Sequence, residues 1–364
     1  MQKTRSIFLY PFSLLYGLIT AVRNFLFDSG VLKPEEFNIP VICVGNLAAG
    51  GTGKTPHTEY LTDLLKKEFN VAVLSRGYKR KTRGFLIAGA GSSVSEIGDE
   101  PLQMSLKFPD LVIAVDSNRI RGVQGILREK PKTNVIILDD GFQHRRITPG
   151  YSILLTAYDR LMINDHMLPY GNLRESKMNM RRADIILITK SPESVSAIQR
   201  RIIVKEINKF PYQNLYFTSV TYSDPVPVFD GNIPAPGIFD ARLKDDTGIV
   251  LVTGIADPGP LAEYIKARSA EQVILSFGDH HRFRERDIEK FTNAWYSLKS
   301  GRKFLFTTEK DAVRLREFTN FTEPIRSTSY YIPVGIHFLN DDQEEFDNLI
   351  TDYVRKNKRN NRIS

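Results

Sequence analysis

The chain has 364 residues, of which 41% are hydrophobic and 25% charged, and this composition excludes a disordered or fibrous protein. The length predicts about two domains. A formal charge of +8 suits anionic partners such as nucleotides or phospholipid surfaces, and the single cysteine, Cys43, excludes an internal disulfide and a cysteine-based zinc site, as in a cytoplasmic protein.

The first expected element is an apolar helix over residues 7–22, preceded by Lys3 and Arg5. No small-residue cleavage site follows it, which disfavours a secreted signal peptide. A helix of this length reaches about 24 Å, short of the roughly 30 Å hydrocarbon core of a bilayer. We therefore expect a membrane-associated helix within residues 1–28 that lies at the interface, with a buried N-terminal helix as the alternative.

Beyond residue 28, short apolar runs alternate with longer amphipathic segments, which is typical of a parallel sheet with helices on both faces. The expected strands are residues 39–44, 71–75, 111–115, 135–138, 153–156 and 185–189. Helices are expected over residues 54–69 and 99–107. The sequence therefore predicts an α/β, P-loop NTPase-type domain over residues 29–220.

Residues 221–245 interrupt this pattern with a stretch rich in proline and glycine, which predicts a linker. The alternation then resumes, and we expect a second, smaller α/β lobe over residues 246–350. Its expected strands are residues 249–253, 273–276, 303–307 and 331–334. Residues 351–364 are polar and basic, which predicts a tail that frays.

The clearest functional motif is GNLAAGGTGKTP, which follows a predicted strand and precedes a predicted helix. This is the context of a phosphate-binding loop, here from Gly45 to Thr55, although Ala48 stands where the strict pattern has its first glycine. The expected cofactor-binding residues are Gly50, Gly51, Thr52, Gly53, Lys54 and Thr55. The glycines let backbone amides surround the phosphates of ATP, while Lys54 would reach the β- and γ-phosphates and Thr55 would bind Mg²⁺.

Asp139 and Asp140 follow the strand expected at residues 135–138, where P-loop enzymes hold Mg²⁺ with an aspartate. Two aspartates before a glycine also form turns, but the phosphate loop favours the metal site. After the strand at residues 185–189 the sequence reads ITKSPES, without the guanine-reading Asn-Lys-x-Asp. This weakens a GTPase hypothesis and favours a kinase, which needs a base for its acceptor hydroxyl.

Two places in the sequence offer such a base. Asp279, His280 and His281 follow a predicted strand, where ligand-contacting residues of open sheets gather, although a histidine pair alone is more typical of a surface loop. Asp99 and Glu100 of the GDEP motif begin a predicted helix, where simple N-terminal capping is the alternative.

Together these motifs resemble the tetraacyldisaccharide 4'-kinase family, whose members phosphorylate a lipid A precursor on the cytoplasmic face of the inner membrane. The resemblance is carried, in chain order, by VGNLAAGGTGKTP, LSRGYKR, IGDEP, LDDGFQHR, LPYGNLRES, TGIADP, FGDHHRF and TTEKDAVRL. It implies transfer of the γ-phosphate of ATP, with Mg²⁺, to the 4'-hydroxyl of a tetraacyldisaccharide 1-phosphate, forming lipid IVA. It also implies a membrane-associated N-terminal helix.

The resemblance also assigns roles to residues. It implies that Asp99 is the catalytic base, that His281 or His280 is its partner, and that Lys54 contributes to catalysis, so that catalytic groups come from both lobes. The residues implied at the metal are Thr55, Asp139, Asp140 and Glu175. The expected contacts to sugar or phosphate are Arg76, Tyr78, Arg119 and Arg174, since arginine clamps pairs of anionic oxygens. For each of these four, a surface arginine or a packed tyrosine is the alternative.

Two other functions are compatible with a phosphate loop. One is a P-loop NTPase that acts as a regulatory switch or maturation factor. The other is a membrane-surface scaffold with a degenerate nucleotide site, which the intact Lys54, Thr55 and paired aspartates disfavour. Nucleic acid is not an expected partner.

Overall fold

The computed structural model describes residues 7–229, 237–319 and 321–360, and the chain divides into two compact units. The first unit comprises Met1–Ile97, Met104–Thr221 and Ile336–Ser364. The second comprises Gly98–Gln103 and Tyr222–Gly335. The chain therefore returns to the first unit near its C-terminus, whereas the sequence predicted one continuous C-terminal lobe over residues 246–350.

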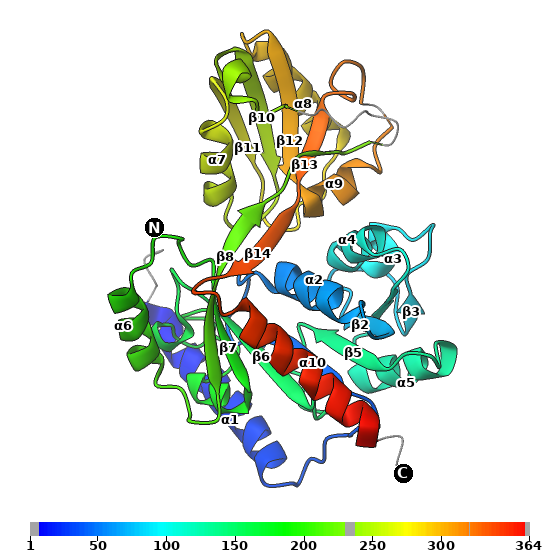
Figure 1. Cartoon of the computed structure of the whole chain (residues 1–364), viewed down its shortest axis with the longest axis vertical. Helices are drawn as coiled ribbons and strands as arrows, with labels where there is room; N and C mark the ends of the chain where they lie inside the picture. Colours follow the sequence, from blue (N-terminus) through cyan, green and yellow to red (C-terminus); the bar gives the residue numbers. More distant parts are fainter. Residues whose placement is uncertain (1–6, 230–236, 320, 361–364) are drawn as a thin grey trace. The chain divides into compact units, whose positions relative to one another are not determined.

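A nine-stranded sheet forms the centre of the first unit, in the order β14-β8-β7-β6-β1-β5-β2-β4-β3 (Figure 1). Its strands are β1 (Val41–Asn46), β2 (Val71–Ser75), β3 (Leu86–Ile87), β4 (Val112–Val115), β5 (Val135–Asp139), β6 (Tyr151–Ala157), β7 (Ile185–Thr189), β8 (Asn214–Tyr222) and β14 (Val334–Phe338). From β8 to β4 every neighbouring pair is parallel, and the short edge strand β3 runs antiparallel to β4. The six strands predicted here are confirmed.

Helices cover both faces of this sheet, because alternate strand residues point to opposite sides. The helices of this unit are α1 (Tyr10–Asp28), α2 (Lys54–Leu65), α3 (Val94–Ile97), α4 (Asp99–Lys107, which begins in the second unit), α5 (Arg119–Glu129), α6 (Ala197–Ile207) and α10 (Gln343–Asn360). Apolar side chains of α2 and α10 pack on Ile42 and Val44, while α5 packs on the opposite face beside Val41. This three-layer arrangement confirms the predicted α/β fold.

Most of the residues predicted to form a basic tail belong instead to helix α10. Its side chains Phe346, Ile350 and Val354 are fully buried in the core of the first unit. They recur at every fourth position, which is the spacing of one helix face. The prediction of a fraying tail was therefore wrong for residues 351–360, and residues 361–364 lie outside the described part of the chain.

The second unit contains a five-stranded sheet in the order β11-β10-β12-β13-β9. Its strands are β9 (Val226–Pro227), β10 (Thr247–Thr253), β11 (Glu271–Ser276), β12 (Arg302–Thr308) and β13 (Ser329–Ile332), and its helices are α7 (Gly259–Lys266), α8 (Glu285–Ser297) and α9 (Glu309–Leu315). Helices α8 and α9 contribute to the core on one face of this sheet, and α7 contributes to the core on the other. The strand predicted at residues 331–334 is divided: β13 belongs to this sheet, and β14 belongs to the nine-stranded sheet.

The predicted linker at residues 221–245 is partly built into the second unit. Val228 and Phe229 are buried in one of its cores, and Ile238 is buried in the other. These apolar side chains anchor the segment on either side of residues 230–236, which the structure does not describe.

Helix α1 exposes its apolar side chains and buries polar ones. Phe12, Leu18 and Phe25 are each more than 60% exposed, whereas Ser13 and Asn24 are buried. Among the described residues, Ile7–Asp28 forms a helix whose length and apolar composition would suffice to cross a membrane, and little of it is buried. The helix is thus longer than the predicted 7–22 segment, and it is not the buried core helix considered as the alternative. Lys3 and Arg5 lie outside the described residues.

Candidate active site

The phosphate loop connects β1 to α2 in the first unit. Gly50, Gly51 and Gly53 have φ angles of 72°, 63° and 77°, which are left-handed conformations that glycine adopts without steric cost. Ala48, the departure from the strict motif, instead forms a bridge with Leu173 in the first half of the loop. Its side chain is therefore accommodated where the backbone is extended.

Side chains from three strands and α2 hold the second half of this loop. Asn46 donates to the Thr52 hydroxyl at 2.7 Å, and the Thr189 hydroxyl donates to the Thr52 carbonyl at 2.9 Å. His57 Nδ1 lies 2.7 Å from the Gly53 carbonyl, so this nitrogen carries the proton, and Nε2 lies 2.9 Å from the Thr218 hydroxyl. Burial lowers the pKa of His57 to about 4, which keeps the imidazole neutral at pH 7.

The two predicted metal-binding aspartates lie at the end of β5 and have different partners. Asp139 is buried and accepts hydrogen bonds from Thr58 at 3.2 Å and Ser75 at 3.0 Å. Asp140 forms ion pairs at 3.4 Å with Lys54 and with Arg174. Burial opposes ionisation of Asp140, but these two cations outweigh it and lower the pKa of the carboxyl. A negative charge therefore lies beside Lys54 at neutral pH.

Asp140 has the chemistry that Mg²⁺ requires. Its Oδ1 is buried and lies 3.4 Å from Lys54 Nζ, and a carboxylate oxygen is a preferred Mg²⁺ ligand. Across residues 7–229, 237–319 and 321–360, no three acidic, histidine or cysteine side chains are grouped closely enough to hold a metal by themselves. A magnesium site here thus needs the phosphates of a nucleotide as additional ligands.

Glu175, the fourth residue expected at the metal, is engaged elsewhere in the first unit. Its buried carboxylate is paired closely with Arg182, and Arg23 lies 3.9 Å away. Burial raises the pKa of Glu175 despite these arginines. In the described structure it is a partner of arginines, and its role at a metal remains a prediction.

Two basic cavities lie in the first unit near the end of β4 and share Ser117. The smaller has a volume of about 300 Å³ and is lined by Arg23, Ser117, Asn118, Arg119, Ile120, His144, Arg145 and Arg146. The larger, about 670 Å³, is lined by Arg76, Gly77, Tyr78, Lys79, Arg80, Thr82, Arg83, Gly84, Ser117 and Arg121. Such a density of cations attracts anionic ligands.

Arg119 supports this region from inside the protein. It is buried and donates to the carbonyls of Asp116 and Asp139, both at 2.8 Å. Burial lowers the pKa of Arg119 to about 10, so it stays charged at neutral pH. Burial, together with Arg119 and Arg76, lowers the pKa of His144 to about 4. The smaller cavity thus keeps one neutral imidazole among its arginines.

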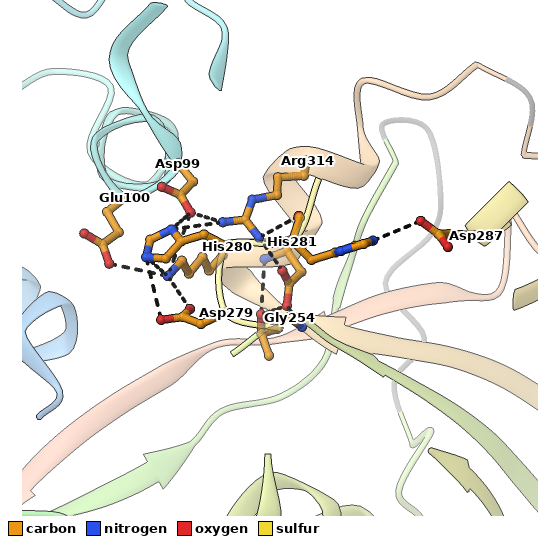
Figure 2. A network of polar contacts seen from close by, with 11 residues as sticks. Asp99, Glu100, Gly254, Asp279, His280, His281, Asp287 and Arg314 are labelled. Carbon is orange, nitrogen blue, oxygen red and sulfur yellow. Dashed lines mark hydrogen bonds and ion pairs between the residues drawn. The ribbon is translucent and has the colours of Figure 1, made fainter. Parts of the chain in front are cut away.

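In the second unit, Asp99 at the start of α4 meets the loop that follows β11 (Figure 2). His280 Nδ1 lies 2.9 Å from Asp99 Oδ2, and the Arg314 guanidinium is in close contact with the same oxygen. Burial opposes ionisation of Asp99, but the hydrogen bond from His280 and the charges of Arg314 and Lys310 hold its pKa well below the usual range. Asp99 is therefore a carboxylate bound to an imidazole.

The adjacent histidine points to a different partner. His281 Nε2 lies 2.9 Å from Asp287 Oδ2, and its ring stacks on Phe277 with the ring centroids 4.6 Å apart. His280 has a φ of 59°, a left-handed conformation that is uncommon for histidine. The structure thus brings His280, and not His281, to Asp99.

Residues 5–355 match the family described as LpxK, tetraacyldisaccharide-1-P 4'-kinase. The chain belongs to this family. A tetraacyldisaccharide 4'-kinase of Bacteroides thetaiotaomicron is 46% identical over 364 residues, covering 98% of this chain and 95% of the relative. That of Phocaeicola vulgatus is 46% identical over 359 residues, covering 98% and 97%. A crystal structure of "apo" form LpxK from Aquifex aeolicus in complex with ATP shares 29% identity at a TM-score of 0.71, covering 95% of this chain and 98% of that one.

These matches confirm the family and the fold class predicted from the sequence, and the relatives are named as kinases. The structure brings Lys54 to Asp140 and Asp99 to His280, and it places Arg76, Tyr78 and Arg119 in the basic cavities. Arg174 instead pairs with Asp140.

Sequence reasoning overlooked several side chains around these sites. His57 directly follows the phosphate-loop motif in the first turn of α2, but a histidine at that position gives no signal of its neighbours. Basic residues of the smaller cavity lie in LDDGFQHR and the following Arg146. The run of basic residues after the paired aspartates was the available signal for them.

Proposed function

We propose that this protein transfers the γ-phosphate of ATP to the 4'-hydroxyl of a tetraacyldisaccharide 1-phosphate, forming lipid IVA in lipid A biosynthesis. The observation that carries the proposal is the family match over residues 5–355, within which the phosphate loop and its neighbouring aspartates are intact. A kinase also needs a group that accepts the hydroxyl proton, and the Asp99–His280 pair supplies one.

The nucleotide is held by the first unit. The left-handed glycines turn backbone amides of the loop toward the phosphates, and Lys54 exchanges its pairing with Asp140 for the β- and γ-phosphates. Mg²⁺, held by Thr55 and the aspartates Asp139 and Asp140, would neutralise charge on the transferred phosphoryl group. Thr52 and His57 keep the loop in shape before the nucleotide arrives.

The acceptor hydroxyl is activated by the Asp99–His280 pair. As the 4'-oxygen attacks the γ-phosphorus, its proton passes to His280 Nε2 and the bond to the ADP leaving group breaks. Asp99 stays ionised, because its pKa is held low, and stabilises the imidazolium that forms. His281 is not the partner in this scheme, since Asp287 binds it.

The anionic part of the substrate is bound by the basic cavities. A sugar phosphate carries the charge that Arg119 and its neighbouring arginines attract, and arginine can bind two phosphate oxygens at once. Arg76 and Tyr78 of the larger cavity offer a cation and an exposed ring for the sugar. Arg174, which pairs with Asp140, contributes a further cation to the binding of the anionic substrate.

Helix α1 associates with the cytoplasmic face of the inner membrane. Its exposed Phe12, Leu18 and Phe25 form an apolar surface, while Ser13 donates to the Met167 carbonyl at 2.8 Å. Ser13 near the start of the helix and Asn24 near its end are both buried, and these polar residues favour a position in the interface over a full crossing of the bilayer. Acyl chains of the substrate can then remain in the membrane during the reaction.

The decisive experiment is a phosphorylation assay with the full chain, ATP, Mg²⁺ and the tetraacyldisaccharide 1-phosphate in detergent. We expect a lipid product heavier by one phosphoryl group and one ADP for each product molecule. Folded protein that binds ATP but yields no phosphorylated lipid would contradict the proposal. Hydrolysis of GTP without a lipid product would instead favour a regulatory switch.

Membrane association is tested by sedimentation with vesicles that contain anionic phospholipid. Replacing Phe12, Leu18 and Phe25 together by serine should move the protein from the vesicle pellet to the supernatant. A matched control replaces Ile198 and Ile202, two exposed apolar residues of α6, by serine. Equal sedimentation of the α1 variant and the wild type would show that another surface binds the bilayer.

A further inference from the structure

Two motifs have no role in the scheme above. They are TGIADP, which contains Gly254, and TTEKDAVRL, which contains Lys310 and Arg314. In the second unit both motifs lie around Asp99, and the two cations of the second motif contact its carboxylate (Figure 2). We propose that Arg314 is a positioning residue for the Asp99–His280 pair, and that Asp311 holds Arg314 in place. This inference deepens the proposed function and rests on it.

Both terminal nitrogens of the Arg314 guanidinium contact neighbouring groups, and Nη2 also lies 3.4 Å from His280 Nδ1. Nη2 contacts Asp99 Oδ2, while Nη1 donates to Asp311 Oδ1 at 2.9 Å and to the His281 carbonyl at 3.3 Å. The Arg314 side chain is only 8% exposed. A guanidinium used in this way does not offer its donors to a substrate phosphate, so Arg314 acts through Asp99 and the histidine loop.

Asp311 is anchored on the side facing away from Arg314. Its Oδ2 accepts from the Gly254 amide and from the Thr308 hydroxyl, both at 2.7 Å. A β-carbon at position 254 would lie 2.9 Å from Asp311 Oδ1, so a larger residue there would displace this carboxylate. Gly254 of TGIADP thus positions Asp311 of TTEKDAVRL, and Asp311 in turn holds Arg314.

Lys310 fixes the tautomer of His280. Its Nζ lies 3.2 Å from His280 Nε2, and an ammonium group can only donate hydrogen bonds. Nε2 must therefore accept, and the imidazole proton resides on Nδ1, facing Asp99. Asp279 and Glu100 lie 3.2 Å and 3.6 Å from Lys310, so this lysine retains acidic partners when Nε2 takes up a proton.

Charged groups from three elements surround the Asp99 carboxylate. They are His280 and Asp279 of the loop after β11, Lys310 and Arg314 of α9, and Glu100 of α4 itself. Burial favours the neutral acid, and the cations oppose it. Removal of Arg314 would leave the effect of burial less opposed, so the Asp99 pKa would rise from its lowered value toward the usual range.

The test compares Arg314→Gln with Arg314→Lys in the lipid phosphorylation assay as a function of pH. For Arg314→Gln we expect kcat to fall about 100-fold, as misplacement of a catalytic group does, while KM for ATP changes less than about threefold. The acid limb of the pH profile should move upward by about one unit. Arg314→Lys, which keeps the charge, should be about tenfold more active than Arg314→Gln, and the acid limb of its pH profile should return most of the way to the wild-type position. Arg242→Gln, which breaks an exposed arginine–aspartate pair of the same unit, is the matched control and should leave activity unchanged.

A purely structural arginine would give a different pattern. Loss of activity without a shift of the acid limb, with no recovery in Arg314→Lys, would overturn the inference. In an Asp99→Asn background, Arg314→Gln should cost less than about threefold, because both substitutions act on one unit; additive losses would also overturn it. If Arg314→Gln does not fold, Asp311→Asn is used in its place. The acid limb of its pH profile should shift in the same direction by a smaller amount. An unshifted acid limb in Asp311→Asn would count against the inference.

Failure of this inference can be distinguished from failure of the proposed function. If Asp99→Asn loses turnover and Arg314→Gln keeps it with an unmoved acid limb, the inference alone is wrong. If Asp99→Asn also keeps wild-type turnover, the proposed Asp99–His280 pair itself is wrong. A nitrogen-detected NMR spectrum of the six histidines gives a readout independent of activity. His280, assigned through His280→Gln, should show a protonated Nδ1 in both proteins, because Lys310 is retained, and the Nδ1 chemical shift should change in Arg314→Gln, because the Asp99 oxygen that Nδ1 faces loses its arginine partner. An unchanged Nδ1 chemical shift would contradict positioning by Arg314.

Discussion

Two clusters of ion pairs differ in how closely their charged groups approach. The loose cluster of the first unit comprises Lys54, Asp140 and Arg174, and the tight cluster of the second unit comprises Asp99, His280 and Arg314. Lys54 and Arg174 each lie 3.4 Å from Asp140, and all three side chains are partly exposed. Asp99 and Arg314 are in close contact and no more than 8% exposed. Loose, accessible pairs can exchange partners when a phosphate binds, whereas a buried pair fixes geometry in advance. Under the proposed function, the first cluster would bind the nucleotide and the second would be preorganised for proton transfer.

The largest expected effect comes from removing the cation of the loose cluster. Lys54→Ala should lower turnover by about 1000-fold, because it deletes a charge that stabilises the transferred phosphoryl group, and should also weaken ATP binding. Turnover of lipid and calorimetric ATP affinity measure the two effects. Lys66→Ala removes an exposed lysine paired with Asp63 and serves as the control. Unchanged ATP affinity in Lys54→Ala would mean that Lys54 does not exchange partners with the nucleotide.

A smaller effect separates the two histidines of the tight cluster. His280→Gln should lower kcat by about 100-fold through loss of the proton acceptor, with ATP affinity retained. His281→Gln, its matched control one residue away, should lower kcat less than about threefold, because His281 contacts Asp287 and not Asp99. Equal losses in the two variants, measured in the lipid assay, would contradict the assignment of His280.

His57, which holds the phosphate loop in place, should have a smaller effect, on the affinity for ATP. His57→Leu removes the hydrogen bonds to Gly53 and Thr218 and should weaken ATP binding about tenfold, the cost of a few lost hydrogen bonds. Because the pKa of His57 is lowered to about 4, this difference should be constant from pH 6 to pH 8, a range of roughly two units around neutrality. His337→Leu, on the surface of the same unit, is the control. A difference that varies across this range would show that His57 titrates there.

A separate expected effect concerns the stability of the fold. The pKa of Asp99 is lowered on folding, so its ionised form stabilises the folded chain above its unfolded pKa of about 3.9, and this contribution is lost as pH falls toward the folded value. The free energy of unfolding of the wild type should exceed that of Asp99→Asn by about 3 kcal/mol at neutral pH, typical of breaking a buried pair. Fluorescence of Trp295, the single tryptophan, reports on the second unit. A difference that does not shrink below about pH 4 would contradict the ionised pair.

The loose cluster could be predicted from the sequence, and the tight one could not be completed from it. Gly45 to Thr55 is one continuous motif between a strand and a helix, so its roles follow from local order. Asp99, His280 and Arg314 are far apart in the chain, and no spacing rule relates them. The family resemblance supplied Asp99 and left His280 and His281 as alternatives, because both follow the same strand and differ only in side-chain direction.

The fold shows the same limit. Buried strands such as β2 and β7 were predicted at their observed bounds, because a continuous apolar run marks a strand covered on both faces. Helix α10 was overlooked because its polar residues outnumber the apolar stripe that Phe346, Ile350 and Val354 bury. Similarly, β13 and β14 read as one strand, since a sheet change at Pro333 leaves no signal in hydrophobicity.

The most direct test of a nucleotide-binding first unit and a proton-accepting second unit compares the wild type with Asp99→Asn in one experiment. ATP affinity and formation of phosphorylated lipid are measured on the same samples. The account predicts that both proteins bind ATP within about threefold of each other, while Asp99→Asn forms product about 1000-fold more slowly. Wild-type product formation by Asp99→Asn, or a parallel loss of ATP binding, would contradict it.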